Sequence, residues 1–417
     1  MYLPDNLPPI LAKSTGETLY QHTWHVLERF ADQVRLRPML PDQVGQPRLW
    51  HHLYWAALFH DLGKATPGFQ QVLHPGSSAR WLYRHEVGSL AFLAWLPLEP
   101  TEDDYRWLVA AIVSHHKDAP VIREQYKDEG PSIAAIAQDL AQADLAALWQ
   151  WLDACANRWI IDLGLSANGI LPLSLLPAAA AIDRIRNDGA ALIAHALRTY
   201  RQMLHPRWLR PHALHSLLVR GILTTADHRA SAGLAAAPVL PARDYTWLVD
   251  QIATLRGHPM SLYDHQTRSA QTRGNVVLIA PTGSGKTEAA LCWAFGMPAQ
   301  PVPRLFYALP FQASMNAMYT RLTSYIPDSV GLQHGRALQA LYRLFMETDG
   351  SSLGAWQQAR DQHERTALNY FPVRVCSPYQ LLKAVYRLRG YEALLSDCIG
   401  GAFILDEIHA YEPAVWP

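Results

Sequence analysis

A glycine-rich octapeptide in the second half of the sequence constrains the fold more than any other feature. It reads Ala280-Pro-Thr-Gly-Ser-Gly-Lys-Thr287, and it lies between an apolar run at 276–280 and a helix-compatible segment at 288–295. Glycines let backbone N–H groups turn towards phosphate oxygens at a helix N-terminus, where the helix dipole favours anions. Alanine in place of the first glycine is the one departure from the usual phosphate-loop pattern. We therefore expect a strand, a phosphate loop and a helix, in that order.

An acidic pair further along the chain completes the predicted nucleotide site. The loop residues expected to bind nucleotide are Thr282, Gly283, Ser284, Gly285, Lys286 and Thr287. Lys286 is expected to reach the β- and γ-phosphates and Thr287 to bind Mg²⁺. Such a site needs a carboxylate at the end of a neighbouring strand to hold the metal. Asp406 follows the apolar run at 402–405, and Glu407 is placed to orient or activate the attacking water.

The distribution of apolar residues predicts two domains of different class. Up to about residue 235 the pattern is helical, with expected helices starting at a Ser14/Glu17 capping box and covering 50–58, 107–113 and 133–151. After residue 270, strand-like runs at 276–280, 305–309, 373–376 and 402–405 alternate with helix-compatible segments, which favours a mostly parallel sheet. We expect a helical domain over 1–235, a linker with a short helix (245–255) over 236–260, and an α/β domain over 261–417.

Composition excludes several classes. The 417 residues carry 36 basic and 36 acidic side chains, so net charge indicates no polyanionic partner, and any nucleic-acid contact must be local. The four cysteines form no CxxC pair and are too few for a disulfide framework. We find no apolar run of membrane-spanning length and no secretory signal. These features predict a cytoplasmic protein without a membrane partner.

Histidine is the unusual component, with 19 residues, of which 14 lie before residue 235. His22 lies on the first predicted helix, His60 is followed by Asp61, His85 is followed by Glu86, and His115 and His116 end the predicted helix at 107–113; Asp227 lies further along the chain. Mixed imidazole and carboxylate ligands suit divalent transition metals, and a shared carboxylate suits a metal pair that hydrolyses phosphodiesters. For His25, His51, His52 and His74 we expect packing in the core instead.

Several motifs resemble those of superfamily 2 helicases. The acidic pair lies in Asp406-Glu-Ile-His409, which resembles their second motif, and Gln266 in Tyr263-Asp-His-Gln266 resembles the glutamine that recognises adenine. Three further segments resemble motifs that grip the nucleic-acid backbone: 308–312, His334-Gly335 and 376–380. The resemblance implies that the bound nucleotide is ATP with Mg²⁺.

The histidine set resembles the HD-nuclease domain of the CRISPR-associated nuclease-helicase of type I systems, and the order of the two domains agrees. The resemblance implies an all-α HD-type metal phosphohydrolase domain followed by an α/β RecA-like P-loop lobe. One metal is then expected on His22, His60, Asp61 and Asp227, and a second on Asp61, His85, His115 and His116. Lys64 is expected to contact the scissile phosphate. The expected catalytic residues are therefore Asp61 and Lys64 in the helical domain, together with Glu407 in the nucleotide site. The implied metals are Mn, Fe, Ni or Co.

The same resemblance implies a partner set. A nuclease of this kind cuts single-stranded DNA, the displaced strand of an R-loop opened by an RNA-guided surveillance complex, and translocates 3′ to 5′ with ATP. Superfamily 2 motors need two RecA-like lobes, so we expect that the sequence lacks the second lobe, which a separate chain could supply. A docking module without motor activity and an HD phosphohydrolase that acts on nucleotides are the alternatives. A basic and aromatic stretch at 201–220 is a candidate DNA path, although a solvated helix face is the simpler reading.

Overall fold

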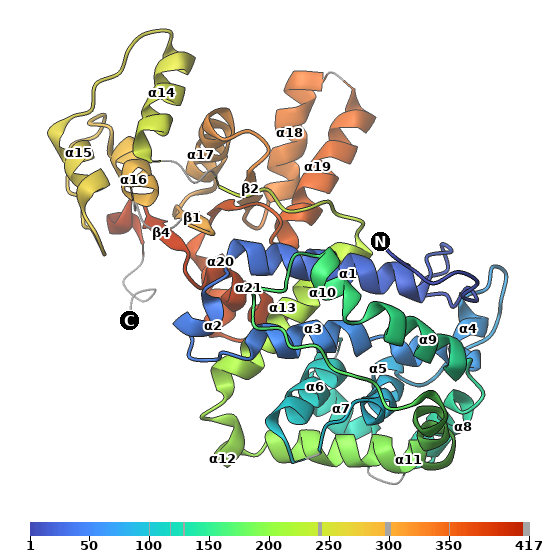
Figure 1. The fold of residues 1–417 in the computed structure, drawn as a ribbon. Coiled ribbons are helices and arrows are strands. Elements are labelled where there is room, and N and C mark those ends of the chain that lie inside the picture. Colours follow the sequence, from blue (N-terminus) through green and yellow to red (C-terminus); the bar gives the residue numbers. More distant parts are fainter. Residues whose placement is uncertain are drawn as a thin grey trace. The chain divides into compact units, whose positions relative to one another are not determined.

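The computed structural model describes residues 1–99, 101–116, 118–127, 130–240, 244–296, 302–349 and 351–411. The chain divides into two compact units, Met1–Ala236 and Ala237–Pro417. The first unit is helical and the second contains a parallel sheet (Figure 1). Among the described residues, no helix combines the length and apolar character needed to cross a bilayer.

The first unit is built from helices of very different lengths. They are α1 (Leu19–Leu36), α2 (Leu40–Gln43), α3 (Leu49–Phe59), α4 (Pro67–Leu73), α5 (His85–Ser89), α6 (Asp103–Ser114), α7 (Ala119–Gln125), α8 (Pro131–Leu140), α9 (Leu145–Cys155), α10 (Arg158–Asp162), α11 (Ala178–Met203), α12 (Pro206–Leu209) and α13 (Ala213–Ser231), with 3₁₀ turns at Leu62–Ala65 and Leu90–Trp95. All eleven residues of α3 are buried. A helix that is apolar on every side belongs inside a domain, and α3 packs against α1, α6 and α13 (Figure 1).

Two sequence predictions for this unit need correction. The capping box of α1 is formed by Thr18 and Gln21, whose side chains and backbone N–H groups bond reciprocally, and not by Ser14 and Glu17. The helix expected over 133–151 is divided into α8 and α9. The side chain of Asp144 accepts a hydrogen bond from the Ala147 N–H at 3.0 Å. A side-chain cap of this kind starts a new helix. The apolar periodicity of the sequence runs through both helices and therefore does not reveal the break between them.

The second unit alternates helices and strands. Its elements are α14 (Tyr245–Arg256), α15 (Asp264–Gln271), α16 (Lys286–Phe295), β1 (Leu305–Ala308), α17 (Gln312–Tyr325), β2 (Val330–Gln333), α18 (Ala337–Asp349), α19 (Ser352–Ala367), β3 (Val373–Cys376), α20 (Pro378–Val385), α21 (Tyr391–Cys398), β4 (Ala402–Leu405) and a 3₁₀ turn at Ile408–Ala410. The segment expected as a linker contains α14, and Leu248 and Ile252 of that helix are buried in the core of this unit.

The sheet has the order β2-β3-β1-β4, and its three pairings are all parallel. Leu305 of β1 lies opposite Val373 of β3 and Ala402 of β4, which sets the register. The predicted parallel α/β fold is therefore confirmed. Strand β2 was not predicted, because Gly331 and Gln333 interrupt its apolar pattern.

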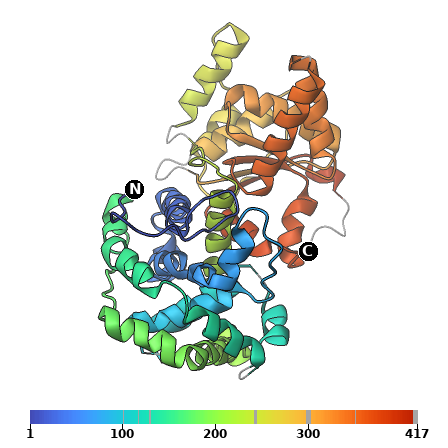
Figure 2. The same ribbon diagram turned by 90° about the vertical axis from the view of Figure 1, so that its right-hand side faces the viewer.

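The two faces of the sheet are covered by different helices. Leu305 and Tyr307 of β1 belong to a large core that includes residues of α14, α16, α17 and α19, whereas Phe306 packs with residues of α20 and α21. This alternation follows from the two-residue period of a strand. The view in Figure 2 shows the strands of this unit side by side with helices packed against them. Parallel strands end at one edge, so the loops after β1 and β4 lie together.

The strand expected before the phosphate loop is absent. Residues 276–280 do not form a strand, and the side chains of Val277 and Ile279 are 90% and 94% exposed. A strand needs a neighbour for its backbone hydrogen bonds. Among the described residues β4 pairs with β1 alone, and no ladder forms with residues 276–280. An apolar run indicates that a segment can pair, but it does not supply the partner.

Candidate metal centre and nucleotide site

The first unit gathers all seven predicted metal ligands from five helices or their ends. His22 lies on α1, His60 and Asp61 directly follow α3, His85 begins α5, His115 and His116 directly follow α6, and Asp227 lies on α13. The buried helix α3 determines the position of the centre, because it ends where His60 and Asp61 must be, with both residues almost fully buried.

Asp61 occupies the middle of this cluster, and its two oxygens face different histidines. Oδ2 lies 3.3 Å from Nε2 of His22 and 3.3 Å from Nε2 of His60. Oδ1 lies 3.0 Å from Nε2 of His85 and 3.8 Å from Nε2 of His115. A carboxylate placed in this way can share its oxygens between two cations.

Three groups of potential ligand atoms each lie within 4.8 Å of one another. They are Asp61 with His85, His115 and His116; His22 with His60 and Asp61; and His60 with His115 and Asp227. Asp227 is further connected to His22, whose Nε2 lies 3.3 Å from Oδ1. The first two groups share Asp61, so the donors suit two ions more naturally than one.

The hydrogen-bonding state of these side chains tests whether they fit a metal. Within the described structure, both oxygens of Asp61 and the Nε2 atoms of His22, His60, His85 and His115 are buried and make no hydrogen bond of good geometry, although Lys64 Nζ forms an ion pair with Oδ2 of Asp61. Nδ1 of His60 bonds to the Ala57 carbonyl at 2.7 Å, and Nδ1 of His115 bonds to the Ile112 carbonyl at 2.6 Å. A carbonyl can only accept, so these bonds place the proton on Nδ1 and leave a lone pair on Nε2. The residues therefore fit a bound metal ion.

The electrostatics of the cluster are dominated by burial and by Asp61. Burial alone opposes ionisation of Asp61, but His60, Lys64 and further histidines hold its pKa well below the usual range. Burial disfavours protonation of His22, yet Asp227 and Asp61 outweigh it and raise its pKa to about 9. Burial together with His115 lowers the pKa of His116 to about 2. Asp61 thus stays ionised inside the cluster, which is what a cation site requires.

Lys64 lies at the edge of the cluster. Its Nζ is 2.7 Å from Oδ2 of Asp61, and burial is outweighed by Asp61 so that the pKa of Lys64 is raised. The structure therefore places a lasting positive charge next to the predicted metals. Its contact with a scissile phosphate stays a prediction.

The other histidines divide into two kinds. His51 and His52 are buried as expected, and His52 Nε2 lies 2.8 Å from Asp104 Oδ1. His25 and His74 are exposed instead of packed in the core. His25 pairs with Glu17 at the surface, and His74 follows the end of the short helix α4.

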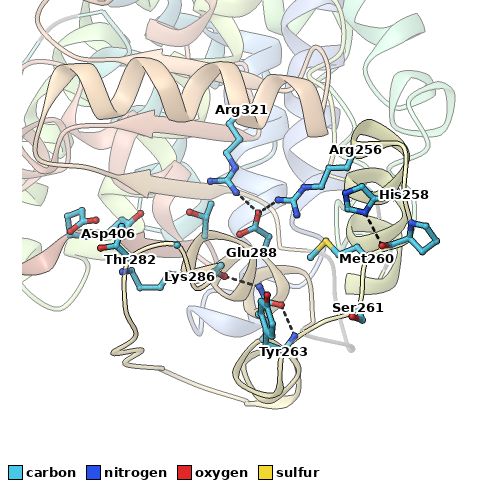
Figure 3. Close-up of a pocket in the computed structure, with 16 residues that line it drawn as sticks. Arg256, His258, Met260, Ser261, Tyr263, Thr282, Lys286, Glu288, Arg321 and Asp406 are labelled. Carbon is cyan, nitrogen blue, oxygen red and sulfur yellow. Dashed lines mark hydrogen bonds and ion pairs between the residues drawn. The ribbon is translucent and has the colours of Figure 1, made fainter.

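The second unit contains a cavity of about 520 Å³ around the phosphate loop (Figure 3). Its lining includes all the predicted nucleotide-binding residues except Ser284, namely Gln266, Thr282, Gly283, Gly285, Lys286, Thr287, Asp406 and Glu407. The hydroxyl of Ser284 donates to the Pro281 carbonyl at 2.7 Å. Gly283 and Gly285 both have a φ of 79°, a left-handed conformation that turns the loop around the space in front of α16.

The predicted adenine-reading residue, Gln266, bonds to the loop. Its Oε1 accepts the Tyr263 N–H at 2.9 Å, and its Nε2 donates to the Gly285 carbonyl at 3.0 Å. One N–H and one lone pair of the amide are left for a base. Lys286 Nζ donates to the Ala280 carbonyl at 3.0 Å. This hydrogen bond lies within the phosphate loop, and we expect the ammonium group to exchange it for a contact with phosphate.

Sequence reasoning missed four residues near this cavity. Tyr307 on β1 donates to Asp406, and Glu288 on α16 accepts from Arg256 and Arg321. Arg256, Glu288 and Arg321 line the cavity. Glu288 directly follows Thr287 in the sequence, which is the one signal that pointed to any of the four.

The candidate DNA path at 201–220 is partly packed into the fold. Trp208 stacks on His212 with ring centroids 4.3 Å apart and also contacts Trp107 at 5.0 Å. Arg220 donates to the Ser114 carbonyl at 2.9 Å. Arg207 and Arg210 are exposed. The aromatic part of this stretch is therefore packed against Trp107, and Arg207 and Arg210 are two separate cations that face solvent.

Together, the fold and the two sites define a class: an all-helical unit with an HD-type cluster of metal ligands, followed by a RecA-like P-loop lobe. Family models agree with both halves. The model described as "Cas3, HD domain" matches residues 16–233, and the model described as "DEAD/DEAH box helicase" matches residues 264–414. The first match covers more than half of the chain. The chain therefore belongs to the Cas3 HD domain family, and it is a Cas3-like HD-helicase protein.

Curated relatives have the same two-part description. The chain is 28% identical over 410 residues to the CRISPR-associated nuclease/helicase Cas3 of Methanothermobacter thermautotrophicus, covering 88% of this chain and 45% of the relative. It is 27% identical over 341 residues to the CRISPR-associated endonuclease/helicase Cas3 of Escherichia coli, covering 75% and 35%. For the putative CRISPR-associated nuclease/helicase Cas3 of Myxococcus xanthus the values are 26% over 457 residues, 97% and 56%.

The chain thus spans about a third to just over half of the length of these relatives. Among solved structures, it is similar to T. fusca Cas3, with a TM-score of 0.49 and 19% identity, covering 99% of this chain and 47% of that chain. The structure of T. fusca Cas3 with ATP gives a TM-score of 0.48 and 19% identity, covering 95% and 45%.

Proposed function

We propose that this chain is a metal-dependent nuclease that cuts single-stranded DNA in CRISPR interference and couples the cut to an ATP-driven motor. The observation that carries the proposal is the position of Asp61, whose two oxygens face separate histidine groups. One carboxylate between two imidazole sets is suited to a pair of ions that share a bridging ligand.

The metal residues have distinct proposed roles. His22, His60, Asp61 and Asp227 hold one ion, and Asp61, His85, His115 and His116 hold the other. Mn, Fe, Ni or Co suit these mixed nitrogen and oxygen donors. When bound, a metal pair activates water and stabilises the leaving oxygen of a phosphodiester. Asp61 and Lys64 act at the centre: Asp61 joins the two sets, and the Lys64 ammonium binds the negative phosphate next to them.

In the second unit, the loop residues bind the ATP phosphates, and Lys286 leaves its loop carbonyls to contact them. Thr287 and Asp406 hold Mg²⁺, Glu407 orients or activates the attacking water, and Gln266 reads adenine with its remaining N–H and lone pair. The proposed motor runs 3′ to 5′ along the displaced strand of an R-loop. An RNA-guided surveillance complex presents that strand, and a second RecA-like lobe, in the same or a separate chain, completes the motor.

The test of the nuclease proposal is cleavage of circular single-stranded DNA by the purified chain with Mn²⁺. We expect cleavage by the wild type, loss of at least a hundredfold in Asp61→Ala, and no change in His74→Ala, a histidine at the surface of the same unit. Equal cleavage by Asp61→Ala would refute the assignment. Hydrolysis of dATP faster than DNA under the same conditions would replace the proposal with a nucleotide phosphohydrolase. Tight binding of the surveillance complex without any cleavage would favour a docking module.

A further inference from the structure

A buried carboxylate lies directly after the phosphate-binding residues of α16. Lys286, Thr287 and Glu288 form the first turn of this helix. Glu288 is only 3% exposed, yet it lines the same cavity as the other two residues. The helix dipole favours a negative charge in the first turn. Burial is costly for a carboxylate unless partners compensate it, so the partners of Glu288 show what it is for.

Two arginines from separate helices converge on one oxygen of Glu288. Arg256, the last residue of α14, donates from Nη2 to Oε1 at 3.2 Å. Arg321 of α17 donates from Nη2 to the same oxygen and from Nε to the Tyr325 hydroxyl at 3.0 Å. Figure 3 shows both guanidinium groups pointing to the carboxylate from different sides. Glu288 is therefore the point where three helices of this unit are connected by charge.

Arg256 connects the carboxylate of Glu288 to a second segment that lines the cavity. Arg256 is followed by Gly257, in the left-handed conformation with φ 70°, and then by the wall segment, which we define as residues 257–263. The wall segment supplies His258, Met260, Ser261 and Tyr263 to the cavity lining and leads into Gln266. Gln266 in turn donates to Gly285 in the phosphate loop.

The wall segment is consequently connected at both of its ends to the phosphate loop or to the first turn of α16, which directly follows that loop. The connection before the segment is made by Arg256 to Glu288, and the connection after it is made by Gln266 to Gly285. We propose that Glu288 is a positioning residue of the nucleotide site, which holds the wall segment in place for the non-phosphate part of the nucleotide. This inference rests on the proposed ATP site.

Electrostatics alone make the opposite prediction, which gives the proposal a sharp test. The cavity is lined by three cations, Arg256, Lys286 and Arg321, and by three carboxylates, Glu288, Asp406 and Glu407. Removing the charge of Glu288 makes the cavity more positive, so a simple charge effect strengthens the binding of every polyphosphate. Loss of a held wall weakens the binding of ATP and spares inorganic tripolyphosphate, which has no base or ribose.

The experiment measures the dissociation constants of Mg²⁺-ATP and Mg²⁺-tripolyphosphate for the full chain by calorimetry. Wild type and Lys286→Ala are measured first. If the wild type does not bind ATP, or if Lys286→Ala binds it as tightly as the wild type, the proposed ATP site is refuted, and this inference with it. Given binding, we expect Glu288→Gln to weaken ATP binding by about tenfold and tripolyphosphate binding by less than twofold. Glu364→Gln, which breaks an exposed pair with Arg360 on α19, is the matched control and leaves both constants unchanged.

A double-mutant cycle adds a readout that general destabilisation does not move. We expect Arg256→Gln to weaken ATP binding similarly and the double variant Arg256→Gln/Glu288→Gln to be no weaker than Glu288→Gln alone, because both changes break one contact. Glu288→Asp retains the charge and recovers part of the affinity. Full additivity, wild-type affinity in Glu288→Gln, or a parallel loss of tripolyphosphate binding would overturn the proposal. Should Glu288→Gln not fold, the half-exposed Arg256→Gln carries the same comparison of the two ligands.

Discussion

The hydroxyl of Tyr307 donates a hydrogen bond to Oδ2 of Asp406 over 2.7 Å, while Oδ1 of the same carboxylate accepts the Glu407 N–H at 2.9 Å. β1 and β4 are neighbouring parallel strands, so their ends bring the two side chains together. Burial and the neighbouring Asp406 raise the pKa of Tyr307 well above its usual value, which keeps the hydroxyl protonated as a donor. A tyrosine from β1 thus fixes the orientation of the proposed Mg²⁺ ligand that directly follows β4.

Replacing this tyrosine tests that role. In Tyr307→Phe, Oδ2 of Asp406 loses its hydrogen bond. We expect Mg²⁺-ATP affinity to fall by about tenfold, which corresponds to the lower end of the roughly 1.5–3 kcal/mol for a hydrogen bond to a charged group. Binding of ATP in EDTA should not change. The control is Tyr319→Phe, which removes a buried hydroxyl that accepts from Gln362 elsewhere in the same unit. Equal losses in both variants would contradict the account.

The phosphate loop offers a comparison of two glycines with the same backbone strain. Gly283 and Gly285 both have φ 79°, but a Cβ on Gly285 would lie 2.3 Å from Nε2 of Gln266, whereas a Cβ on Gly283 meets nothing within 4 Å. Both alanine variants carry the cost of a left-handed residue, about 1–2 kcal/mol. We expect Gly285→Ala to weaken ATP binding clearly more than Gly283→Ala, because it also displaces Gln266. Calorimetric titration of both variants with ATP checks this, and equal affinities would contradict it.

A buried ion network in the second unit predicts a large stability effect. Asp397 of α21 accepts from Nε of Arg304 at 2.8 Å and from Nη2 of Arg374 at 2.9 Å, and all three side chains are buried. Asp397→Asn removes the charge that compensates both guanidinium groups. We expect the free energy of unfolding in urea to fall by about 3–5 kcal/mol. The exposed pair broken by Glu364→Gln should cost no more than about 1 kcal/mol. A change below 1 kcal/mol in Asp397→Asn would show that the network contributes little.

The buried histidines away from the metal cluster predict how stability depends on pH. Burial and Arg48 lower the pKa of His51 to about 4. The unfolded chain therefore binds a proton near pH 6.5 that the folded chain refuses, so this contribution to stability is complete above pH 6.5 and is lost as the pH falls towards 4. His51→Asn retains an acceptor for the Leu171 N–H, which Nδ1 holds at 3.2 Å, and does not titrate.

We expect the wild type to lose on the order of 1–2 kcal/mol more than His51→Asn between pH 7 and pH 4.5, from urea unfolding at each pH. His74→Asn, at an exposed histidine, should follow the wild type. Parallel curves for wild type and His51→Asn would show that His51 titrates normally in the folded state.

Sequence patterns located the site residues better than the elements that carry them. The expected ligand residues could be named because their chemistry is distinctive, and the structure brings together residues as far apart in the sequence as His22 and Asp227. That they bind metal stays a prediction. The partners of Glu288 were not found, since Arg256 and Arg321 lie 32 and 33 positions away on helices whose packing no local pattern records. The contact between Tyr307 and Asp406 likewise leaves no sign in the sequence, which predicts Tyr307 only as a buried residue of a strand. The strand expected at 276–280 does not form because it has no neighbouring strand to pair with. The helix expected at 133–151 is divided because Asp144 caps the start of a second helix.

The central claim of this account is that Asp61 is shared by two metal ions. Its most direct test is electron paramagnetic resonance of the full chain titrated with Mn²⁺, together with the bound Mn²⁺ per chain. We predict two ions per chain with an exchange-coupled signal, and in Asp61→Asn loss of the coupling and of most binding, while His74→Asn behaves as the wild type. A single uncoupled ion in the wild type, or an unchanged coupled pair in Asp61→Asn, would contradict the claim.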